Sequence, residues 1–152
     1  MRYLVLGAGA LGGYFGGMLL KGGADVAFLV RPARAAQLQR DGLVIKMQDG
    51  GELRTPVRAV QQGQLDGTYD VVLLSCKAYD LDGAMDAIAP AMGEQSVIVP
   101  VLNGVRHIDV LTKRFGPGAR AGRAHGHQCC LDAGRNDPAE PGADQPQRSR
   151  RT

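Results

Sequence analysis

The chain alternates short apolar runs with segments of helical spacing, which is the pattern of buried parallel strands connected by helices. Four apolar runs have the length of strands, near residues 2–6, 25–30, 69–75 and 96–102. Each is followed by a segment with helical character, near residues 11–21, 32–40, 81–92 and 108–115. We therefore predict an α/β fold with a mostly parallel sheet and helices on both faces.

Residues 42–60 interrupt this alternation with the pattern of a β-hairpin. Leu43-Val44-Ile45 and an extended run near 54–60 flank Asp49-Gly50-Gly51, which has the composition of a tight turn. We therefore expect a β-hairpin insertion between the second helix and the third sheet strand.

The pattern changes after Gly118. Residues 119–152 contain one large aliphatic side chain, Leu131, and no aromatic residue. Such a segment cannot bury enough apolar surface to offset the conformational entropy lost on folding. We therefore predict a folded domain over 1–118 and a disordered tail over 119–152. The abundance of Arg, Ala, Gly and Pro in the tail suggests the hypothesis that it is an out-of-frame translation of a GC-rich gene.

Composition and charge exclude several classes of function. The net charge is +3, and residues 1–118 carry 12 Lys or Arg and 11 Asp or Glu, which leaves no basic surface for nucleic acid. The three cysteines do not form a disulfide framework. The uncharged stretch 3–20 is interrupted by six glycines, which argues against a signal peptide or a membrane span. We expect a cytoplasmic protein with no nucleic-acid or membrane partner.

The most informative motif joins the first predicted strand to the first predicted helix. It reads Gly-Ala-Gly-Ala-Leu-Gly, and in this context it is the phosphate-binding turn of a Rossmann-like fold. Gly7 permits the tight turn, Gly9 lets the backbone approach a pyrophosphate, and Gly12 lets the helix pack closely on the sheet. The helix directs its free N–H groups and positive dipole end at the phosphates. We expect the dinucleotide to be bound by Gly7, Ala8, Gly9, Ala10, Leu11 and Gly12.

The residue after the second strand indicates which dinucleotide binds. Sites for NAD have Asp or Glu there, whereas this chain has Arg31, with Arg34 one turn later. A guanidinium can hold a 2′-phosphate through two parallel hydrogen bonds. Arg31 therefore favours NADP over NAD; the alternative is a solvated surface arginine.

Two more candidates follow the carboxyl ends of later strands, where ligands bind in such sheets. Lys77 is placed to neutralise a phosphate or to contact the reacting end of the ligand. Asn103 can offer its amide to a carbonyl or hydroxyl group in the cleft. The alternatives are an ordinary exposed lysine and an Asn-Gly turn.

The remaining histidines and cysteines carry no predicted chemistry. His125, His127, Cys129 and Cys130 lack metal-ligand spacing, so we expect no metal site. We expect His107 at the surface before the last helix.

In order and spacing, these motifs resemble the ketopantoate reductase (2-dehydropantoate 2-reductase) family over about residues 1–118. The matching segments are Gly-Ala-Gly-Ala-Leu-Gly-Gly at 7–13, Leu-Val-Arg at 29–31, the hairpin, Ser-Cys-Lys-Ala-Tyr at 75–79 and Val-Leu-Asn-Gly-Val at 101–105. The resemblance implies NADPH-dependent reduction of a small 2-keto acid, in this family ketopantoate, to pantoate for coenzyme A synthesis. It also implies that Arg31 binds the 2′-phosphate, that Lys77 lies near the cofactor, and that Asn103 contacts the nicotinamide and the substrate.

The resemblance also implies that a helical second domain is absent. Family members continue into another strand and a mostly helical domain that supplies the catalytic lysine, whereas residues 119–123 have no strand pattern. We therefore assign no catalytic residue, and we expect self-association through an exposed sheet edge and apolar surface. Such a chain could bind nucleotide without catalysis. The alternatives are a related NADP-dependent hydroxy-acid dehydrogenase, a nucleotide-sensing domain without catalysis and a non-functional remnant.

Overall fold

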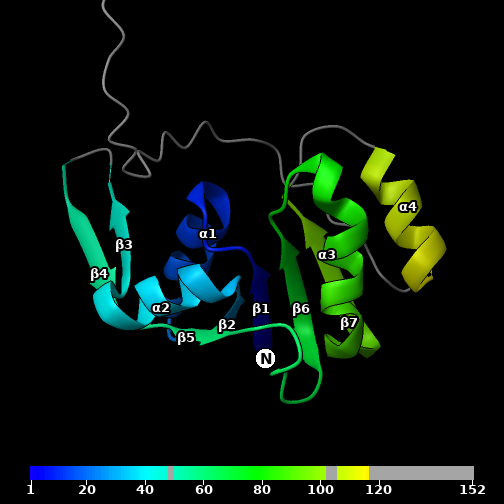
Figure 1. Cartoon of the computed structure of the whole chain (residues 1–152), viewed down its shortest axis with the longest axis horizontal. Coiled ribbons are helices and arrows are strands. Elements are labelled where there is room, and N and C mark those ends of the chain that lie inside the picture. Colours follow the sequence, from blue (N-terminus) through cyan, green and yellow to red (C-terminus); the bar gives the residue numbers. More distant parts are fainter. Residues whose placement is uncertain (48–49, 102–105, 117–152) are drawn as a thin grey trace, which may run out of the picture.

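The computed structural model describes residues 1–47, 50–101 and 106–116, and its centre is a parallel sheet. Five strands form it in the order β5-β2-β1-β6-β7 (Figure 1). Their bounds are β1 (Arg2–Leu6), β2 (Asp25–Leu29), β5 (Arg58–Val60), β6 (Tyr69–Leu74) and β7 (Met92–Pro100). All neighbouring strands pair in parallel, as predicted. The chain order reverses between β1 and β6, and such a reversal opens a crevice at the carboxyl ends of the strands.

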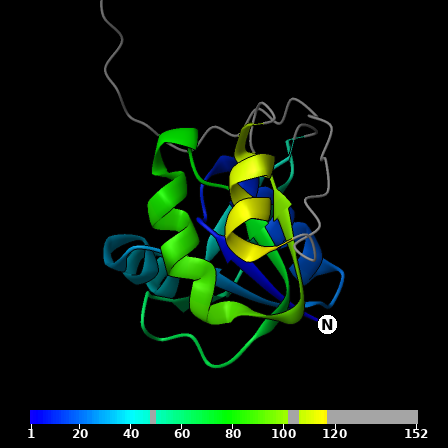
Figure 2. The ribbon, with the colours of Figure 1, turned by 90° about the vertical axis from the view of Figure 1, so that its right-hand side faces the viewer.

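Helices cover both faces of the sheet (Figures 1 and 2). Their bounds are α1 (Ala10–Lys21), α2 (Pro32–Asp41), α3 (Leu81–Ile88) and α4 (Arg106–Phe115). Alternate strand residues enter the two cores, because successive side chains of a strand point to opposite faces. Leu4 and Leu74 are fully buried on the face of α3 and α4. Val5 and Phe28 are fully buried on the face of α1 and α2.

Glycines in the middle of α1 allow the helix to pack closely. A Cβ at Gly16 would press on the ring of Phe28, and a Cβ at Gly17 would collide with Ile45 of the hairpin. Glycine inside a helix costs about 0.5–1 kcal/mol relative to alanine. The absence of side chains at Gly16 and Gly17 offsets this cost by allowing α1 to contact β2 and the hairpin closely.

The hairpin forms, but the predicted run 54–60 is divided between two sheets. β3 (Leu43–Lys46) pairs antiparallel with β4 (Glu52–Thr55). β5 then pairs with β2 at the edge of the main sheet. Pro56 lies between β4 and β5, and it cannot donate a ladder hydrogen bond because it has no N–H. Asp49 of the predicted turn lies outside the described residues.

The predicted helix over 81–92 was too long. α3 ends at Ile88, and residues Ala89–Ala91 form a 3₁₀ turn that contains Pro90. An α-helix cannot continue through this proline, because the proline has no N–H and its ring clashes with the preceding turn. β7 consequently begins at Met92 instead of near residue 96.

His107 is not the surface residue that we expected. It lies inside α4, its exposed fraction is 7%, and burial lowers the pKa of its imidazole. The predicted tail, 119–152, lies outside the described residues. Within the described part of the chain, no helix is long and apolar enough to cross a membrane.

Candidate functional site

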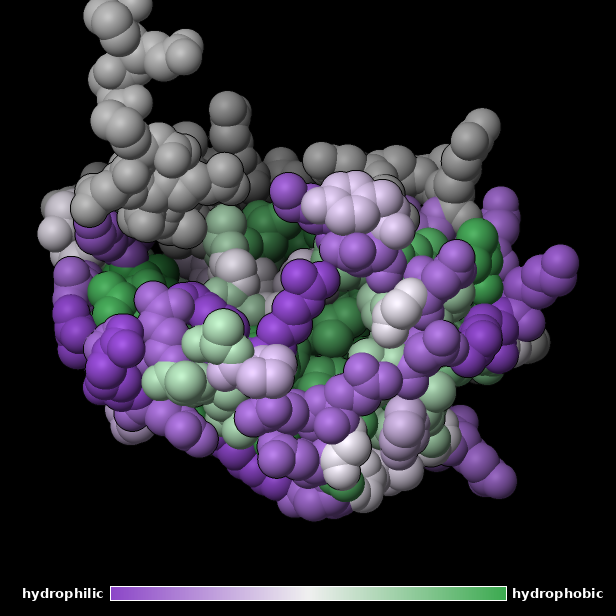
Figure 3. Space-filling view, viewed as in Figure 1, coloured by the Kyte–Doolittle hydropathy of each residue, from purple (hydrophilic) through white to green (hydrophobic). Residues whose placement is uncertain are grey.

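A cleft of about 1390 Å³ opens at the carboxyl ends of β1, β2 and β6. The glycine turn and the residue after β2 line it on one side, and the segment after β6 lines it on the other. The hairpin adds part of the wall. Figure 3 views this side of the molecule, with hydrophobic residues at the base of the hollow between the hairpin and α3 and hydrophilic residues around it. The cleft exceeds the usual size of a small-ligand pocket, so it has room for a dinucleotide.

The first and last glycines of the turn, Gly7 and Gly12, are required by backbone conformation and by packing. Gly7 has a φ of +89°, which favours glycine, and its N–H donates to the Leu29 carbonyl oxygen over 2.9 Å. A Cβ at Gly12 would collide with the Gly7 carbonyl oxygen and with Ser75 Oγ. Gly7 and Gly12 are therefore required for the turn itself and for the packing of α1 on it.

Gly9 differs, because no contact within the described residues requires glycine there. Its φ is −80°, in the extended region that residues other than glycine also adopt, and beyond its chain neighbours no atom of the described residues lies within 4 Å of the position of a Cβ. Gly9 lines the cleft, so a side chain at this position would enter the space of a ligand. The absence of a side chain fits a phosphate group that approaches the backbone.

The start of α1 suits an anion. Its first N–H groups have no intrahelical acceptor, and Gly9 at the N-cap offers no side chain to cap them. The first turn contains no acidic residue. These N–H groups and the positive end of the helix dipole are thus available to a phosphate.

The six predicted residues of the motif have two different roles. Four of them line the cleft: Gly7, Ala8, Gly9 and Ala10. Leu11 and Gly12 do not line it, and Gly12 acts through packing.

Ser75 ties the end of β6 to the glycine turn, a role that the sequence analysis missed. Its hydroxyl donates to the Leu6 carbonyl oxygen over 2.7 Å, and its N–H donates to the same oxygen over 3.3 Å. A small hydroxyl residue is needed here because α1 approaches so closely at Gly12. Only the three-dimensional contact reveals this requirement.

The two arginines after β2 have distinct environments. Arg34 is committed to the protein: it donates to the Ala8 carbonyl oxygen over 2.7 Å and to Gln37 Oε1 over 2.6 Å. Arg34 therefore holds the glycine turn in place. The side chain of Arg31 is 89% exposed at the cleft, with its guanidinium 3.9 Å from Asp80 Oδ2. Arg31 is thus the arginine that can reach a ligand.

The segment after β6 brings a second cation to the cleft. Lys77 is exposed and lines the cleft, with Nζ 5.8 Å from the centre of the Tyr79 ring. Beside it, Cys76 is half-buried, and burial raises the pKa of its thiol. The structure therefore brings Lys77, Arg31 and the glycine turn together. Asn103 lies outside the described residues, as do the histidines and cysteines of the tail.

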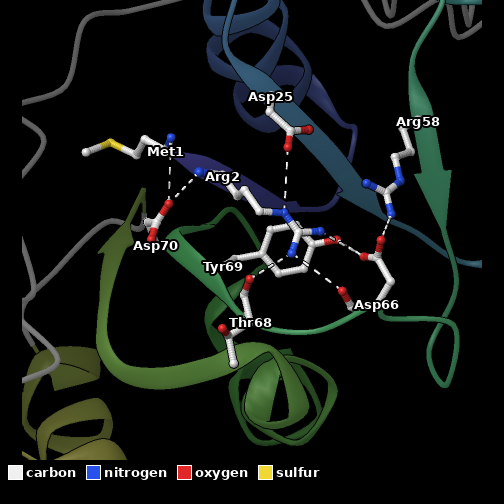
Figure 4. Close-up of polar contacts among 8 residues, drawn as sticks. All are labelled: Met1, Arg2, Asp25, Arg58, Asp66, Thr68, Tyr69 and Asp70. Atoms are coloured by element: carbon white, nitrogen blue, oxygen red, sulfur yellow. Dashed lines mark hydrogen bonds and ion pairs between the residues drawn. The ribbon is translucent and has the colours of Figure 1, made fainter.

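A second charged cluster lies at the opposite end of the sheet (Figure 4). The guanidinium of Arg2 is 4.5 Å from the centre of the Tyr69 ring, and its Nη2 donates to Asp66 Oδ1 over 3.0 Å. Asp66 also accepts hydrogen bonds from Arg58 and from the hydroxyl of Tyr69. These two hydrogen bonds lower the pKa of the Asp66 carboxyl to about 2. This cluster joins strand ends far from the cleft, so we assign it a structural role.

Comparison with known proteins reveals relatives that are similar in sequence and in fold. The sequence model described as ketopantoate reductase PanE/ApbA matches residues 3–141. The uncharacterized oxidoreductase YkpB of Bacillus subtilis is 44% identical over 115 residues, which are 76% of this chain and 37% of that protein. The 2-dehydropantoate 2-reductase of Mesorhizobium japonicum is 38% identical over 106 residues, which are 69% of this chain and 32% of that protein.

A solved structure of D-mandelate dehydrogenase with NADH and anilino(oxo)acetate superposes with a TM-score of 0.69 and 28% identity. The superposition covers 77% of this chain and 38% of that one. The chain thus spans about a third of the length of the relatives that it matches. With a family match over residues 3–141 and the glycine turn at the mouth of a parallel sheet, this chain belongs to the ketopantoate reductase PanE/ApbA family of oxidoreductases.

Proposed function

We propose that the cleft binds NADPH and forms the cofactor side of a reductase for a small 2-keto acid. One observation carries this proposal: the backbone of Gly9, which has no side chain, and the exposed guanidinium of Arg31 line the same cleft. The cleft thus offers bare backbone for a pyrophosphate and an exposed guanidinium for a further phosphate.

In this proposal, residues on each side of the cleft bind a different part of the cofactor. The N–H groups at the start of α1 bind the pyrophosphate. Arg31 binds the 2′-phosphate through paired hydrogen bonds, and Lys77 adds positive charge across the cleft. NADPH, when bound, supplies a hydride to the keto carbon. Arg34 and Ser75 act as positioning residues, because both hold the glycine turn through backbone oxygens.

The proposed substrate is 2-dehydropantoate, which the reduction converts to pantoate. Its support is the family and the similarity to the Mesorhizobium japonicum 2-dehydropantoate 2-reductase. We propose that Asn103 contacts the nicotinamide side and the substrate. We assign no catalytic residue, and the activity of the whole enzyme remains part of the proposal.

A second candidate function is that of a related 2-hydroxy-acid dehydrogenase. The similarity to D-mandelate dehydrogenase, solved with NADH, favours it. A preference of this chain for NADH would favour the second candidate, because only NADPH carries the 2′-phosphate that Arg31 would bind.

A substitution at Gly9 tests the proposal without disturbing the fold. Gly9→Ala adds a Cβ that meets no atom of the described residues beyond its chain neighbours, so the melting temperature should fall only slightly, because alanine is a poorer N-cap residue than glycine. We expect NADPH binding, followed by nicotinamide fluorescence, to weaken about tenfold or more, which corresponds to about 1.4 kcal/mol. Unchanged affinity in a stably folded Gly9→Ala variant would contradict a pyrophosphate at the glycine turn.

A further inference from the structure

An ion pair connects the two sides of the cleft at its mouth. Arg31, after β2, lies 3.9 Å from Oδ2 of Asp80, which ends the short 3₁₀ helix Ala78–Asp80 after β6. Both residues line the cleft, and their side chains are 89% and 46% exposed. The negative charge of Asp80 thus lies beside the guanidinium that the proposed function assigns to a phosphate.

The local structure of Asp80 indicates that this placement is not a by-product of helix capping. Asp80 occupies the N-cap position of α3, where aspartate is among the favoured residues because its side chain can accept from the first N–H groups. Its carboxylate makes no such cap hydrogen bond. The backbone N–H of Asp80 donates to the Lys77 carbonyl oxygen over 2.9 Å, which fixes the turn, and the carboxylate is directed to Arg31 instead.

Such an exposed pair is weak, so a phosphate can replace the carboxylate as the partner of Arg31. A 2′-phosphate brings close to two negative charges, and a carboxylate that remains beside it opposes its binding. At a separation of about 6–8 Å, even in the dielectric of water, one charge near a doubly charged group changes binding by about five- to tenfold. NADH has a neutral 2′-hydroxyl there and does not meet this opposition.

We propose that Asp80 is a specificity-determining residue that lowers the preference of the cleft for NADPH over NADH. It holds Arg31 while the site is free and opposes the 2′-phosphate when NADPH enters. When Arg31 turns to the phosphate, Asp80 is released and can cap the N–H groups of α3. This inference rests on the proposed function of Arg31.

Asp80→Asn is the substitution that tests this role. Asparagine has the same size and is an equally favoured N-cap residue, so the variant removes the charge and keeps the helix start. The matched control is Asp82→Asn, which removes the same charge two residues later, in the first turn of α3 and away from the cleft lining. Dissociation constants for NADPH and NADH are measured for the wild type and both variants, at low and high salt.

We expect Asp80→Asn to bind NADPH about five- to tenfold more tightly, with the affinity for NADH nearly unchanged. The gain should shrink at high salt, because salt screens exposed charges. Asp82→Asn should keep the wild-type ratio of the two constants. A wild-type ratio in Asp80→Asn, or an equal gain for both nucleotides, would overturn the inference and leave the proposed function standing. Failure of the wild type to bind either nucleotide would overturn both.

Discussion

At the scale of single residues, Gly9 and Gly12 show that glycines of one motif are needed for different reasons. A Cβ at Gly9 would enter an open cleft, whereas a Cβ at Gly12 would collide with the Gly7 carbonyl oxygen and with Ser75 Oγ. Gly12 therefore serves packing, whereas we propose that Gly9 serves ligand binding. Both positions are glycine in the sequence motif, so only the three-dimensional surroundings distinguish their roles.

Gly12→Ala should therefore destabilise the protein, in contrast to Gly9→Ala. The obstructing atoms are a backbone oxygen and a hydroxyl that is held by the Leu6 carbonyl oxygen, and neither can move freely. Overpacking of this kind costs about 1–3 kcal/mol. Urea denaturation should show a clearly lower midpoint for Gly12→Ala and only a small decrease for Gly9→Ala, where alanine is a poorer N-cap residue than glycine. Equal midpoints for Gly12→Ala and the wild type would show that the turn does not need this glycine.

At the scale of elements, the charged cluster of Figure 4 connects three segments at the end of the sheet opposite the cleft. Asp66 lies in the connection between β5 and β6, and it accepts from Arg2 of β1 and from Arg58 of β5. Its carboxyl has a pKa of about 2, below the ordinary 3.8, because the hydrogen bond from Arg58 favours the charged form. The folded state thus binds this proton less readily than the unfolded state.

The sign of the pH effect follows from that difference. Asp66 contributes to stability above its ordinary pKa, and the contribution is lost as the pH falls from about 5 towards 2. Asp66→Asn should lower the urea midpoint at neutral pH, and its difference from the wild type should vanish as the pH approaches 2. Asp82→Asn, which changes the same charge outside the cluster, serves as the control. A difference between Asp66→Asn and the wild type that stays constant down to pH 2 would contradict this account.

The sequence predicted most elements, and the exceptions have definite causes. β1, α1, β2 and α2 are bounded by local signals such as Gly22-Gly23 after α1 and Pro32 at the start of α2, so they were found within about a residue or two. The partner of β5 could not be found locally, because that strand pairs with β2 across an inserted hairpin. The early end of α3 was readable in Pro90, a signal that the prediction did not use.

The site was predictable only in part for a similar reason. Arg31 and Lys77 follow strand ends, and the topology of a parallel sheet brings such positions together. The bond from Arg34 to the Ala8 carbonyl oxygen and the pair of Arg31 with Asp80 join segments that no spacing rule connects. These contacts leave the side chain of Arg31 exposed at the cleft and hold that of Arg34 on the protein.

At the scale of the whole molecule, part of the sheet is left open. β7 ends the strand order, so its outer edge has no strand partner among the described residues. Beside it, a shallow hollow of about 370 Å³ is lined entirely by apolar or aromatic side chains: Tyr3, Phe15, Met18, Leu19, Val71, Leu73 and Val99. An open edge next to apolar surface favours association.

We therefore expect the chain to self-associate. Sedimentation should show a mean mass that rises with protein concentration, and Met18→Glu, which places a charge in the hollow, should reduce the rise. Lys46→Glu in the hairpin changes charge away from the hollow and serves as the control. A chain that stays monomeric at every concentration would refute this expectation.

The central claim is that the cleft recognises the 2′-phosphate of NADPH through Arg31. The most direct test is a titration of the wild type, Arg31→Ala and the control Arg40→Ala with NADPH and with NADH, followed by nicotinamide fluorescence. Arg40 lies in α2, the helix that begins after Arg31. It does not line the cleft itself and pairs with Asp41, which does. We predict that the wild type and Arg40→Ala bind NADPH more tightly than NADH. In Arg31→Ala, the affinity for NADPH should fall about tenfold or more, and the affinity for NADH should not change. Absence of binding, or an unchanged preference in Arg31→Ala, would contradict the account.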